Sequence, residues 1–385
     1  MSAMPKNRAK PRDTLGQPSW RISSDRVEAF VTRIGGHVAP VTFDRKGQAI
    51  QPFSVAPWWS ESLPEQTPKI IEVLRGDFFC MPFGSNDKPY RGESHPLHGE
   101  TANRKWQFES FHSKGGRTTL ALSMKTKTRE GRVDKIITLI DGHDALYCRH
   151  VISNMSGPMD FGHHAMLVFD DDEDARVSMS RFKLGQVYPG VFEDPENGGY
   201  SSLKSGAVFK NLSRVPAADG SMADLSRYPA RRGFEDLVQL MADPKLKLAW
   251  TAVVYPKTGF VYLALRDPAV LTGTVLWHSN AGRHYPPWSG RHFGVLGVED
   301  TTSFFHDGLA ASAAPNSHTK RGLVTALRLN PKRPLAVNYI MAVAKIPKGF
   351  DRVKEVKPIK KGVKLTAYTG RGFDVTLDID FLDQK

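Results

Sequence analysis

A polar, loop-rich segment at residues 74–106 contains residue types suited to ligand binding and proton transfer. It includes Arg75 in an Arg-Gly pair, a Pro-Phe-Gly turn at 82–84, a His-Pro-Leu-His-Gly motif at 95–99, and Trp106. A rigid scaffold commonly presents its ligand site on such loops. Gly99 permits a sharp turn and a close approach of the backbone to a ligand. The segment therefore predicts a binding site around His98.

Two later segments carry a pair of histidines and a carboxylate. His163 and His164 lie within the apolar run 161–169, and Glu299 directly follows the apolar run 292–298. Adjacent residues of a strand point to opposite faces, so only one histidine of the pair can face a cleft. Burial at a strand end would raise the pKa of Glu299 and make it a better proton acceptor. A carboxylate and an imidazole are typical groups for general acid–base catalysis.

A third polar cluster lies at residues 277–288. It contains Trp277, His278, Ser279 and Asn280, followed by Arg283, His284, Tyr285 and Trp288. Aromatic rings beside amide, imidazole and guanidinium groups suit a pyranose, which has one apolar face and a rim of hydroxyls. An ordered loop that closes a sheet is the structural alternative.

The elements that position these residues are predicted to be short strands. The expected strands, bounded by Gly, Asp, Asn or Pro, are 26–34, 69–74, 118–124, 135–140, 145–152, 246–255, 260–265, 292–298, 335–343 and 363–368. Turns are expected at 130–132 and 141–143, and short helices only at 232–241 and 302–311. Strands without intervening amphipathic helices favour antiparallel sheets packed face to face. The fold class predicted is therefore all-β, a large antiparallel β-sandwich.

The domain organisation follows from composition. Residues 1–18 are polar and basic and are predicted to be a disordered tail, whereas 19–385 are predicted to form a single sandwich domain. Residues 185–235 are rich in Gly, Pro, Ser and Asp and are predicted to be a long insertion. The acidic run 170–174 lacks calcium-loop spacing and is predicted to be an exposed turn.

The chain has a net charge of +13 and a pI of about 9.6, and its basic residues are scattered. No signature of a nucleic-acid-binding motif accompanies them, so no nucleic-acid partner is expected and an anionic sugar is the preferred explanation.

Cys80 and Cys148 are predicted to be buried thiols. No secretory signal and no run of 18 apolar residues is present, so no membrane partner is expected and a cytoplasmic location is predicted.

The motifs, taken in order, resemble those of the galactose mutarotase-like family, the aldose 1-epimerases and their relatives. The matching order is Arg-Gly, Pro-Phe-Gly, His-Gly, a strand histidine and a strand glutamate. The resemblance covers residues 25–380 and implies a mutarotase-type supersandwich that interconverts the α and β anomers of an aldose. It implies no cofactor and no metal, a monosaccharide or sugar-phosphate substrate, and a monomer or homodimer.

The resemblance also implies roles for particular residues. Glu299 matches the catalytic base, and His164, rather than His163, matches the acid. The residues expected to bind substrate are His98, Arg75, Asn103, Trp277, His278 and Arg283. The sugar-phosphate branch usually has an arginine four residues after the histidine of the His-Gly pair, where this chain has Ala102. A neutral sugar is therefore as strongly implied as a phosphorylated one.

Three other functions stay open. One is a non-catalytic carbohydrate-binding or sugar-sensing protein on the same fold. Another is an oligosaccharide hydrolase or lyase, which predicts a second carboxylate near Glu299 and a cleft open at both ends. The last is a zinc site built from Glu299 and the histidines at 95, 98, 163 and 164, although no HExxH or CxxC spacing supports it.

Overall fold

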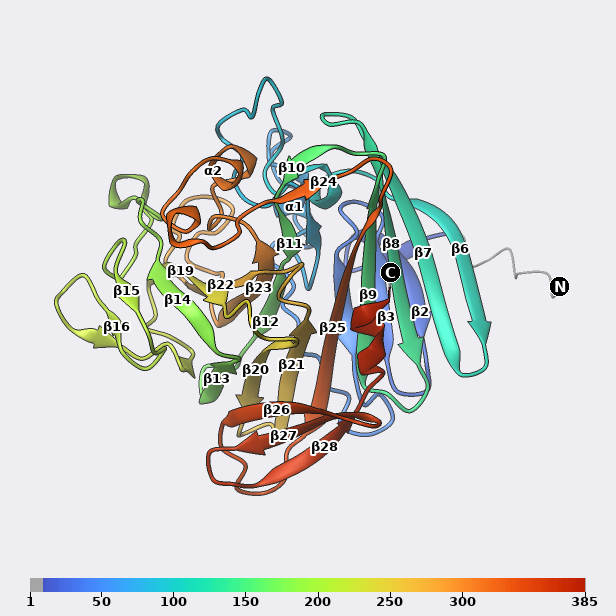
Figure 1. Ribbon diagram of the computed structural model, residues 1–385. Helices are drawn as coiled ribbons and strands as arrows, with labels where there is room; N and C mark the ends of the chain where they lie inside the picture. Colours follow the sequence, from blue (N-terminus) through green and yellow to red (C-terminus); the bar gives the residue numbers. More distant parts are fainter. Residues whose placement is uncertain (1–9, 385) are drawn as a thin grey trace. The chain divides into compact units, whose positions relative to one another are not determined.

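The protein is described by a computed structural model that covers residues 10–384. Its described residues form two compact units, unit 1 (up to 164, 301–341 and from 380) and unit 2 (165–300 and 342–379). Both units consist of antiparallel strands (Figure 1). The two α-helices of the described chain have four and five residues, far short of a membrane-spanning segment.

The strands of unit 1 belong to four sheets, and the unit also contains a few short helices. The strands are β1 (Arg12–Thr14), β2 (Gln17–Ser23), β3 (Glu28–Thr32), β4 (Val38–Thr42), β5 (Phe79–Cys80), β6 (Gln107–Lys114), β7 (Arg117–Thr126), β8 (Gly131–Ile140), β9 (Ala145–Ser153), β10 (Gly157–Met159), β11 (Phe161–His163), β24 (Leu327–Leu329) and the first part of β25 (Leu335–Lys345). The helices are α1 (Lys69–Glu72), η1 (Glu100–Ala102), α2 (Leu309–Ala313), η3 (Thr319–Arg321) and most of η4 (Ile379–Asp383).

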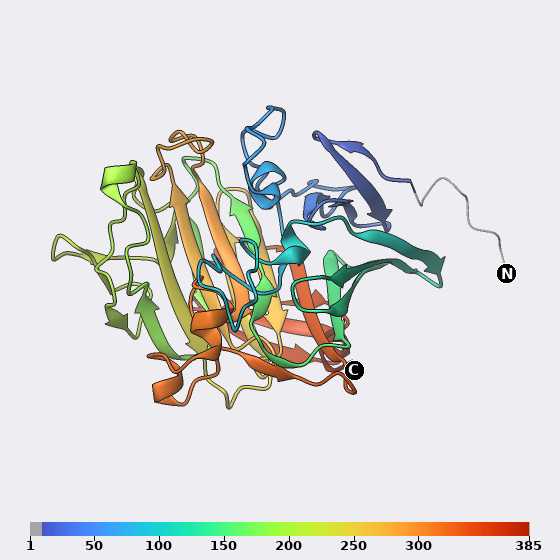
Figure 2. The ribbon, with the colours of Figure 1, turned by 90° about the horizontal axis from the view of Figure 1, so that it is seen from above.

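The strands β6 to β9 form successive hairpins, the first of which is drawn in teal in Figure 2. Gly115 and Gly116 make the β6–β7 turn with φ values of 60° and 74°, in the left-handed region that a tight hairpin turn requires. On β7 the apolar residues Leu120, Leu122 and Met124 are buried at every second position. This alternation leaves the opposite face of the sheet for polar side chains.

Unit 2 contains the remaining elements. They are β12 (Ala165–Val168), β13 (Ala175–Met179), β14 (Phe182–Val187), η2 (Pro195–Asn197), β15 (Val208–Phe209), β16 (Val215–Pro216), β17 (Met222–Ala223), β18 (Arg227–Tyr228), β19 (Phe234–Ala242), β20 (Ala249–Tyr255), β21 (Phe260–Arg266), β22 (Gly273–Asn280), β23 (Val295–Thr302), β26 (Val353–Ile359), β27 (Gly362–Ala367), β28 (Gly372–Thr376) and the last part of β25.

Strands β19, β22 and β23 are neighbours in one sheet, and almost all of their residues are buried. In the β19–β22 register, Glu235 lies opposite Ser279 and Leu237 lies opposite Trp277. Polar side chains in such strands need hydrogen-bonding partners inside the protein, because an unpaired buried polar group is costly. This sheet therefore holds its carboxylates, histidines and indoles in fixed positions.

Strand β23 passes from unit 2 to unit 1 after residue 300. Within unit 2, Val298 pairs with Ala165 of β12, and within unit 1, Thr301 pairs with Gly162 of β11. In the chain, Glu299 directly follows Val298, and His164 directly precedes Ala165.

The all-β, antiparallel prediction is confirmed, but three local predictions are wrong. Residues 69–74, predicted as a strand, begin with α1, whose N-cap residue is Pro68. Residues 232–241, predicted as a helix, contain β19, because a strand buried on both faces loses the alternation that distinguishes it from a helix. Residues 302–311, also predicted as a helix, start at the end of β23 and reach only the beginning of α2.

Other sequence predictions have mixed outcomes. The predicted tail extends to residue 18, but residues 12–18 form β1 and the start of β2, and residues 1–9 lie outside the described residues. Cys80 and Cys148 are buried free thiols, as predicted. The region 185–235 contains mainly turns and two-residue strands, as expected for an insertion. The single domain at 19–385 stays a prediction.

Candidate active site

The carboxyl group of Glu299 is buried within unit 2. The residue is 2% exposed and lies on β23. Burial raises the pKa of Glu299 well above its ordinary value, and the positive charge of Arg283 acts in the opposite direction. A Cβ atom at Gly297 would lie 2.5 Å from Oε1 of Glu299, so the glycine leaves room beside the carboxyl group. A carboxyl group in this setting is suited to proton transfer.

Within unit 2, the guanidinium group of Arg283 contacts a carboxylate and two indole rings. Its Nε donates a hydrogen bond to Oε1 of Glu193 at 2.5 Å. Its guanidinium carbon lies 5.1 Å from the ring centre of Trp277 and 4.5 Å from that of Trp288. Burial acts to lower the pKa of Arg283, but neighbouring carboxylates outweigh it and raise this pKa. The side chain stays 16% exposed, which gives the cluster a polar edge toward solvent.

Glu235 is a second buried carboxylate of this cluster, which sequence reasoning missed. Its Oε2 accepts a hydrogen bond from Nε1 of Trp277 at 2.8 Å, and its Oε1 accepts one from Oγ of Ser279 at 3.0 Å. Burial raises the pKa of Glu235 to about 7, although Arg283 and these donors oppose the shift. The segment was predicted to be helical, which concealed Glu235. As a strand it places Glu235 opposite Ser279.

The indole of Trp277 lies within an aromatic frame. Its ring stacks on that of His292 with centroids 5.4 Å apart, and the ring of Trp288 meets it edge-on at 5.9 Å. The hydroxyl of Ser279 lies 2.6 Å from Nδ1 of His292. Burial lowers the pKa of His292 to about 3, so this imidazole is neutral at physiological pH. The structure therefore groups Trp277 and Arg283 with Glu299, whereas their sugar-binding roles stay predictions.

His278 points away from this cluster. It follows Trp277 on β22, and consecutive strand residues face opposite sides of a sheet. His278 lines a separate cavity of about 260 Å³ together with Asp236 and Ser202, whose hydroxyl donates to Oδ2 of Asp236 at 2.6 Å. Burial lowers the pKa of His278 to about 4. The structure thus does not place His278 with Trp277, as the sequence-based prediction had grouped them.

His164 and His98 form an imidazole pair in unit 1. The ring centroids lie 5.0 Å apart, and the rings meet edge-on at 80°. The ring of His164 stacks on Phe78 at 4.5 Å, and its backbone N–H donates to the carbonyl of Phe78 at 2.9 Å. His164 is 5% exposed and His98 is half-buried. The imidazole of His164 is therefore held in the core, whereas that of His98 is partly exposed on its loop.

The His98-Gly99 turn has an unusual backbone. His98 has a φ of 56°, and Gly99 has a φ of 75°. A Cβ atom at Gly99 would lie 1.9 Å from the carbonyl oxygen of Met81, so only glycine fits there. A non-glycine residue with positive φ is uncommon and is often found at functional sites. Nδ1 of His98 accepts a hydrogen bond from the Gly84 N–H at 3.2 Å, which leaves Nε2 to carry the proton of the neutral ring.

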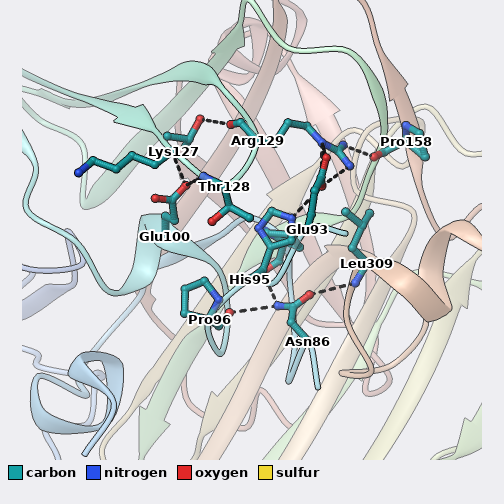
Figure 3. Close-up of polar contacts among 12 residues, drawn as sticks. Asn86, Glu93, His95, Pro96, Glu100, Lys127, Thr128, Arg129, Pro158 and Leu309 are labelled. Carbon is teal, nitrogen blue, oxygen red and sulfur yellow. Dashed lines mark hydrogen bonds and ion pairs between the residues drawn. The ribbon is translucent and has the colours of Figure 1, made fainter. Parts of the chain in front are cut away.

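Polar contacts brace the loop that carries His98 (Figure 3). Nδ2 of Asn86 donates to the carbonyl of Pro96 at 3.2 Å, and its Oδ1 accepts from the Leu309 N–H at 3.0 Å. Closer to the loop tip, Nη2 of Arg129 donates to Oε2 of Glu93 at 2.7 Å. These bonds join residues distant in sequence. They hold the loop in place without using His98 itself.

His163 faces the opposite side of its strand. Its Nδ1 lies 2.9 Å from Oδ2 of Asp77, and its ring stacks on Tyr339 with centroids 4.2 Å apart. Both His163 and Asp77 are fully buried. His163 is the last residue of β11 and His164 directly follows that strand, and the two imidazoles have different neighbours. His164, and not His163, shares a cluster with His98.

Arg75 and Asn103 make contacts typical of structural residues. Arg75 is fully buried, and its Nε, Nη1 and Nη2 donate to the carbonyls of Val73, Thr14 and Leu15 at 3.1, 3.1 and 3.0 Å. Nδ2 of Asn103 donates to the carbonyls of Leu97 and Gly99, at 2.6 and 2.7 Å, and its Oδ1 accepts from the Ile70 N–H at 3.0 Å. Both side chains hold the backbone of unit 1, and sugar binding by either stays a prediction.

The sequence leaves a zinc site open as an alternative. Among residues 10–384, no group of three or more His, Cys, Asp or Glu side chains is arranged to hold a metal ion. Two of the histidines in the zinc alternative instead contact carboxylates, His95 with Glu93 at 3.0 Å and His163 with Asp77. Nothing in the described chain favours the zinc alternative.

No protein-family model and no curated protein matches this sequence. Solved structures do match it. A candidate aldose 1-epimerase from Escherichia coli is 13% identical with a TM-score of 0.57, over 85% of this chain and 99% of that one. Galactose mutarotase-like proteins from Clostridium acetobutylicum (12% identity, TM-score 0.56, 88% and 98% covered) and Lactobacillus casei (12%, 0.54, 85% and 100%) are also similar. At these identities the likeness establishes the fold, which is that of the galactose mutarotase-like proteins.

Proposed function

We propose that the protein is an aldose 1-epimerase-like enzyme, which interconverts the α and β anomers of an aldose by general acid–base ring opening. Glu299 is the base and His164 is the acid. The observation that carries the proposal is the buried carboxyl group of Glu299, whose pKa is raised by burial. Once ionised, a carboxylate with a raised pKa is a stronger proton acceptor than one on the surface. The shared fold adds support at the level of architecture.

The reaction needs two proton transfers and no change of oxidation state. Glu299 takes the proton of the anomeric hydroxyl while His164 gives a proton to the ring oxygen, and the bond between C1 and that oxygen breaks. The open aldehyde rotates about the C1–C2 bond. The ring oxygen then attacks the other face of the carbonyl, the two protons return, and the opposite anomer leaves. All atoms are conserved, and each catalytic residue regains its starting state.

Neighbouring residues assist these steps. The positive charge of Arg283 favours the ionised form of Glu299 and so opposes the effect of burial. His98 contacts His164 edge-on and, with a proton on Nε2, has a donor for a sugar hydroxyl. The substrate is a monosaccharide or a sugar phosphate. A cytoplasmic location and a monomeric or dimeric state are further expectations.

The test is the optical rotation of freshly dissolved α-D-glucose, α-D-galactose and glucose 6-phosphate. We expect the wild type to accelerate equilibration of at least one sugar, and Glu299→Gln to reduce that rate by about 10² to 10⁴, the usual contribution of an acid–base group. Glu65→Gln, at an exposed position, is the matched control and keeps the wild-type rate. Equal acceleration by Glu299→Gln would remove Glu299 from the mechanism. Tight sugar binding without any acceleration would favour the non-catalytic carbohydrate-binding alternative.

Glu235 favours one second candidate, an oligosaccharide hydrolase. Hydrolysis needs two carboxyl groups with different proton affinities. Glu235 and Glu299 both interact with Arg283, and burial raises both of their pKa values. Mutarotation creates no new reducing ends, whereas hydrolysis does. Release of reducing ends from oligosaccharides by the wild type, lost in both Glu235→Gln and Glu299→Gln, would establish the hydrolase.

A further inference from the structure

Unit 1 contains a groove with a volume of about 1030 Å³. Among the residues that line it, one is acidic, Glu130, and six are basic: Lys69, Arg104, Lys105, Lys125, Lys127 and Arg132. Of the residues predicted to act on or bind the substrate, only Asn103 lines the groove, and its amide is bonded to the backbone of Leu97, Gly99 and Ile70. The proton transfers proposed for Glu299 and His164 therefore do not account for this groove. It also concentrates part of the excess positive charge that appeared scattered along the sequence.

The basic side chains of the groove fall into two classes. Arg104 pairs with Glu100, Lys69 pairs with Glu72, and Arg132 pairs with Glu109 and Asp134. In contrast, no carboxylate within the described part of the chain forms an ion pair with the other three lysines of the groove. These three, Lys105, Lys125 and Lys127, are all exposed. We call them the lysine triad.

The backbone holds the triad in position. Oε2 of Glu100 accepts hydrogen bonds from the N–H groups of Lys127 and Thr128 at 2.7 and 3.1 Å, which fixes the turn between β7 and β8. Figure 3 shows the side chain of Lys127 leading away from Glu100. Lys125 lies on β7, and Lys127 lies two residues further along the chain, in the turn that Glu100 fixes. The two ammonium groups therefore come from one short, backbone-held segment beside the groove.

The strand pairing adds to the local concentration of positive charge. Lys125 lies directly opposite Arg132 in the β7–β8 register. Like charges at directly opposed positions destabilise a sheet. The two carboxylates that pair with Arg132 reduce this repulsion but leave Lys125 uncompensated. An anionic ligand in the groove would supply the missing negative charge.

The uncharged lining indicates which kind of anion fits. Gln107 and Asn154 supply amide groups beside the lysines, and the hydroxyl of Thr126, which donates to the Arg129 carbonyl at 2.6 Å, has acceptor capacity left. None of the described lining residues is aromatic, whereas proteins that bind single-stranded nucleic acids stack the bases on aromatic rings. Hydroxyl-rich anions use both ammonium and amide partners. The volume is at the upper end of the range for small-ligand sites, enough for several sugar rings.

We propose that this groove binds an acidic oligosaccharide, a chain of sugars that carries carboxylate or sulfate groups. The lysine triad contacts the anionic groups, and the amides and hydroxyls of the lining contact the sugar hydroxyls. Binding in this groove does not depend on the anomeric chemistry proposed for Glu299. It would let the protein associate with an acidic glycan independently of any substrate at the catalytic residues.

The experiment measures binding of a sulfated heparin octasaccharide and of octagalacturonate to the full chain by isothermal titration calorimetry at low and physiological salt. Maltooctaose is the neutral probe, and a single-stranded oligothymidylate is the nucleic-acid probe. The test variant is Lys105→Gln/Lys125→Gln/Lys127→Gln. The control variant is Lys354→Gln/Lys360→Gln/Lys361→Gln, which removes the same charge from exposed positions on and beside β26 and β27. Circular dichroism and thermal unfolding verify that both variants fold.

We expect at least one acidic probe to bind more weakly as salt increases, and maltooctaose not to bind. The triad variant should lose roughly tenfold or more in affinity, as expected for three exposed ion pairs, whereas the control variant should stay close to the wild type. Equal losses in both variants would mean that only the net charge matters and would overturn the proposal. Absence of acidic-glycan binding, or tighter binding of the oligothymidylate, would overturn it as well.

Discussion

The indole of Trp277 donates a hydrogen bond to the carboxylate of Glu235 at 2.8 Å, across the neighbouring strands β22 and β19. The family resemblance implies that Trp277 is a substrate-binding residue. In the structure, however, its N–H donates to the buried carboxyl group of Glu235. Its ring stacks on that of His292, and the guanidinium group of Arg283 lies 5.1 Å from the ring centre. Trp277 is therefore one of the groups that favour the ionised form of Glu235.

Replacement of that indole should shift the titration of Glu235. Trp277→Phe removes a donor that favours the carboxylate, so we expect the pKa of Glu235 to rise above its value of about 7. We also expect a loss of stability of about 1–3 kcal/mol. Carbon-13 NMR of the glutamate carboxyl groups and urea unfolding measure the two effects. Trp59→Phe, at a site that is 39% exposed, is the control, and an unchanged Glu235 pKa in Trp277→Phe would contradict the assignment.

The buried acid Glu235 should also make stability depend on pH. Its folded-state pKa of about 7 exceeds the ordinary value of 4.5, so between these pH values the folded protein retains a proton that the unfolded chain has released. The free energy of unfolding should therefore fall as pH rises across that window, by an amount of the order of 3 kcal/mol.

Urea unfolding of wild type and Glu235→Gln at several pH values between 4 and 8 measures this effect. The variant lacks the titrating group, whereas Glu299 and the other buried acids remain in both proteins. We expect Glu235→Gln to gain stability relative to the wild type as pH rises from 4.5 to 7. A difference that is constant with pH would show that Glu235 titrates normally.

The two adjacent histidines should respond differently to substitution. His163→Asn removes an imidazole that contacts Asp77 in the core, so we expect a loss of about 1–3 kcal/mol in stability with little change in rate per folded molecule. His164→Asn should reduce the mutarotation rate per folded molecule by about 10² or more, because it removes the proposed acid. Polarimetry on samples of known folded fraction separates the two effects. The reverse pattern would assign the acid to His163.

The pH dependence of the proposed reaction should follow Glu299. A base acts only when ionised, and burial raises the pKa of Glu299, so the rate should increase with pH across a range above the ordinary titration of a glutamate. Arg283→Gln removes the opposing positive charge, so we expect the rising limb to move to higher pH. Polarimetric rates from pH 4 to 9 measure both profiles. Identical profiles would exclude electrostatic coupling between Arg283 and Glu299.

Arg75 should contribute to stability more than to binding. Arg75→Met keeps much of the side-chain volume but removes three hydrogen bonds to the carbonyls of Val73, Thr14 and Leu15. We expect the variant to lose about 2 kcal/mol of stability, since three buried or partly buried carbonyls lose the donor that Arg75 supplies, and to keep the KM of the wild type. A raised KM at unchanged stability would restore the sugar-binding role implied by the family resemblance.

Several features could be predicted from the sequence because they depend on local patterns. The strands at 117–126 and 131–140 alternate apolar and polar residues and are bounded by turn residues, so their type was predictable. Strand β19 was not, because burial on both faces removes the alternation. The helix α1 has four residues and makes too weak a periodic signal to separate it from a strand.

By itself, the sequence determined the residue types and their order along the chain: a His-Gly turn, a pair of strand histidines and a strand-end glutamate, within an all-β pattern. Only the tertiary structure decided which of them share an environment. Alternation along β22 separates His278 from Trp277, the end of β11 separates His163 from His164, and strand pairing brings Glu235 to Ser279. It also gathers distant lysines beside one groove in unit 1. These contacts depend on register and burial, which are properties of the assembled sheet and not of any single segment.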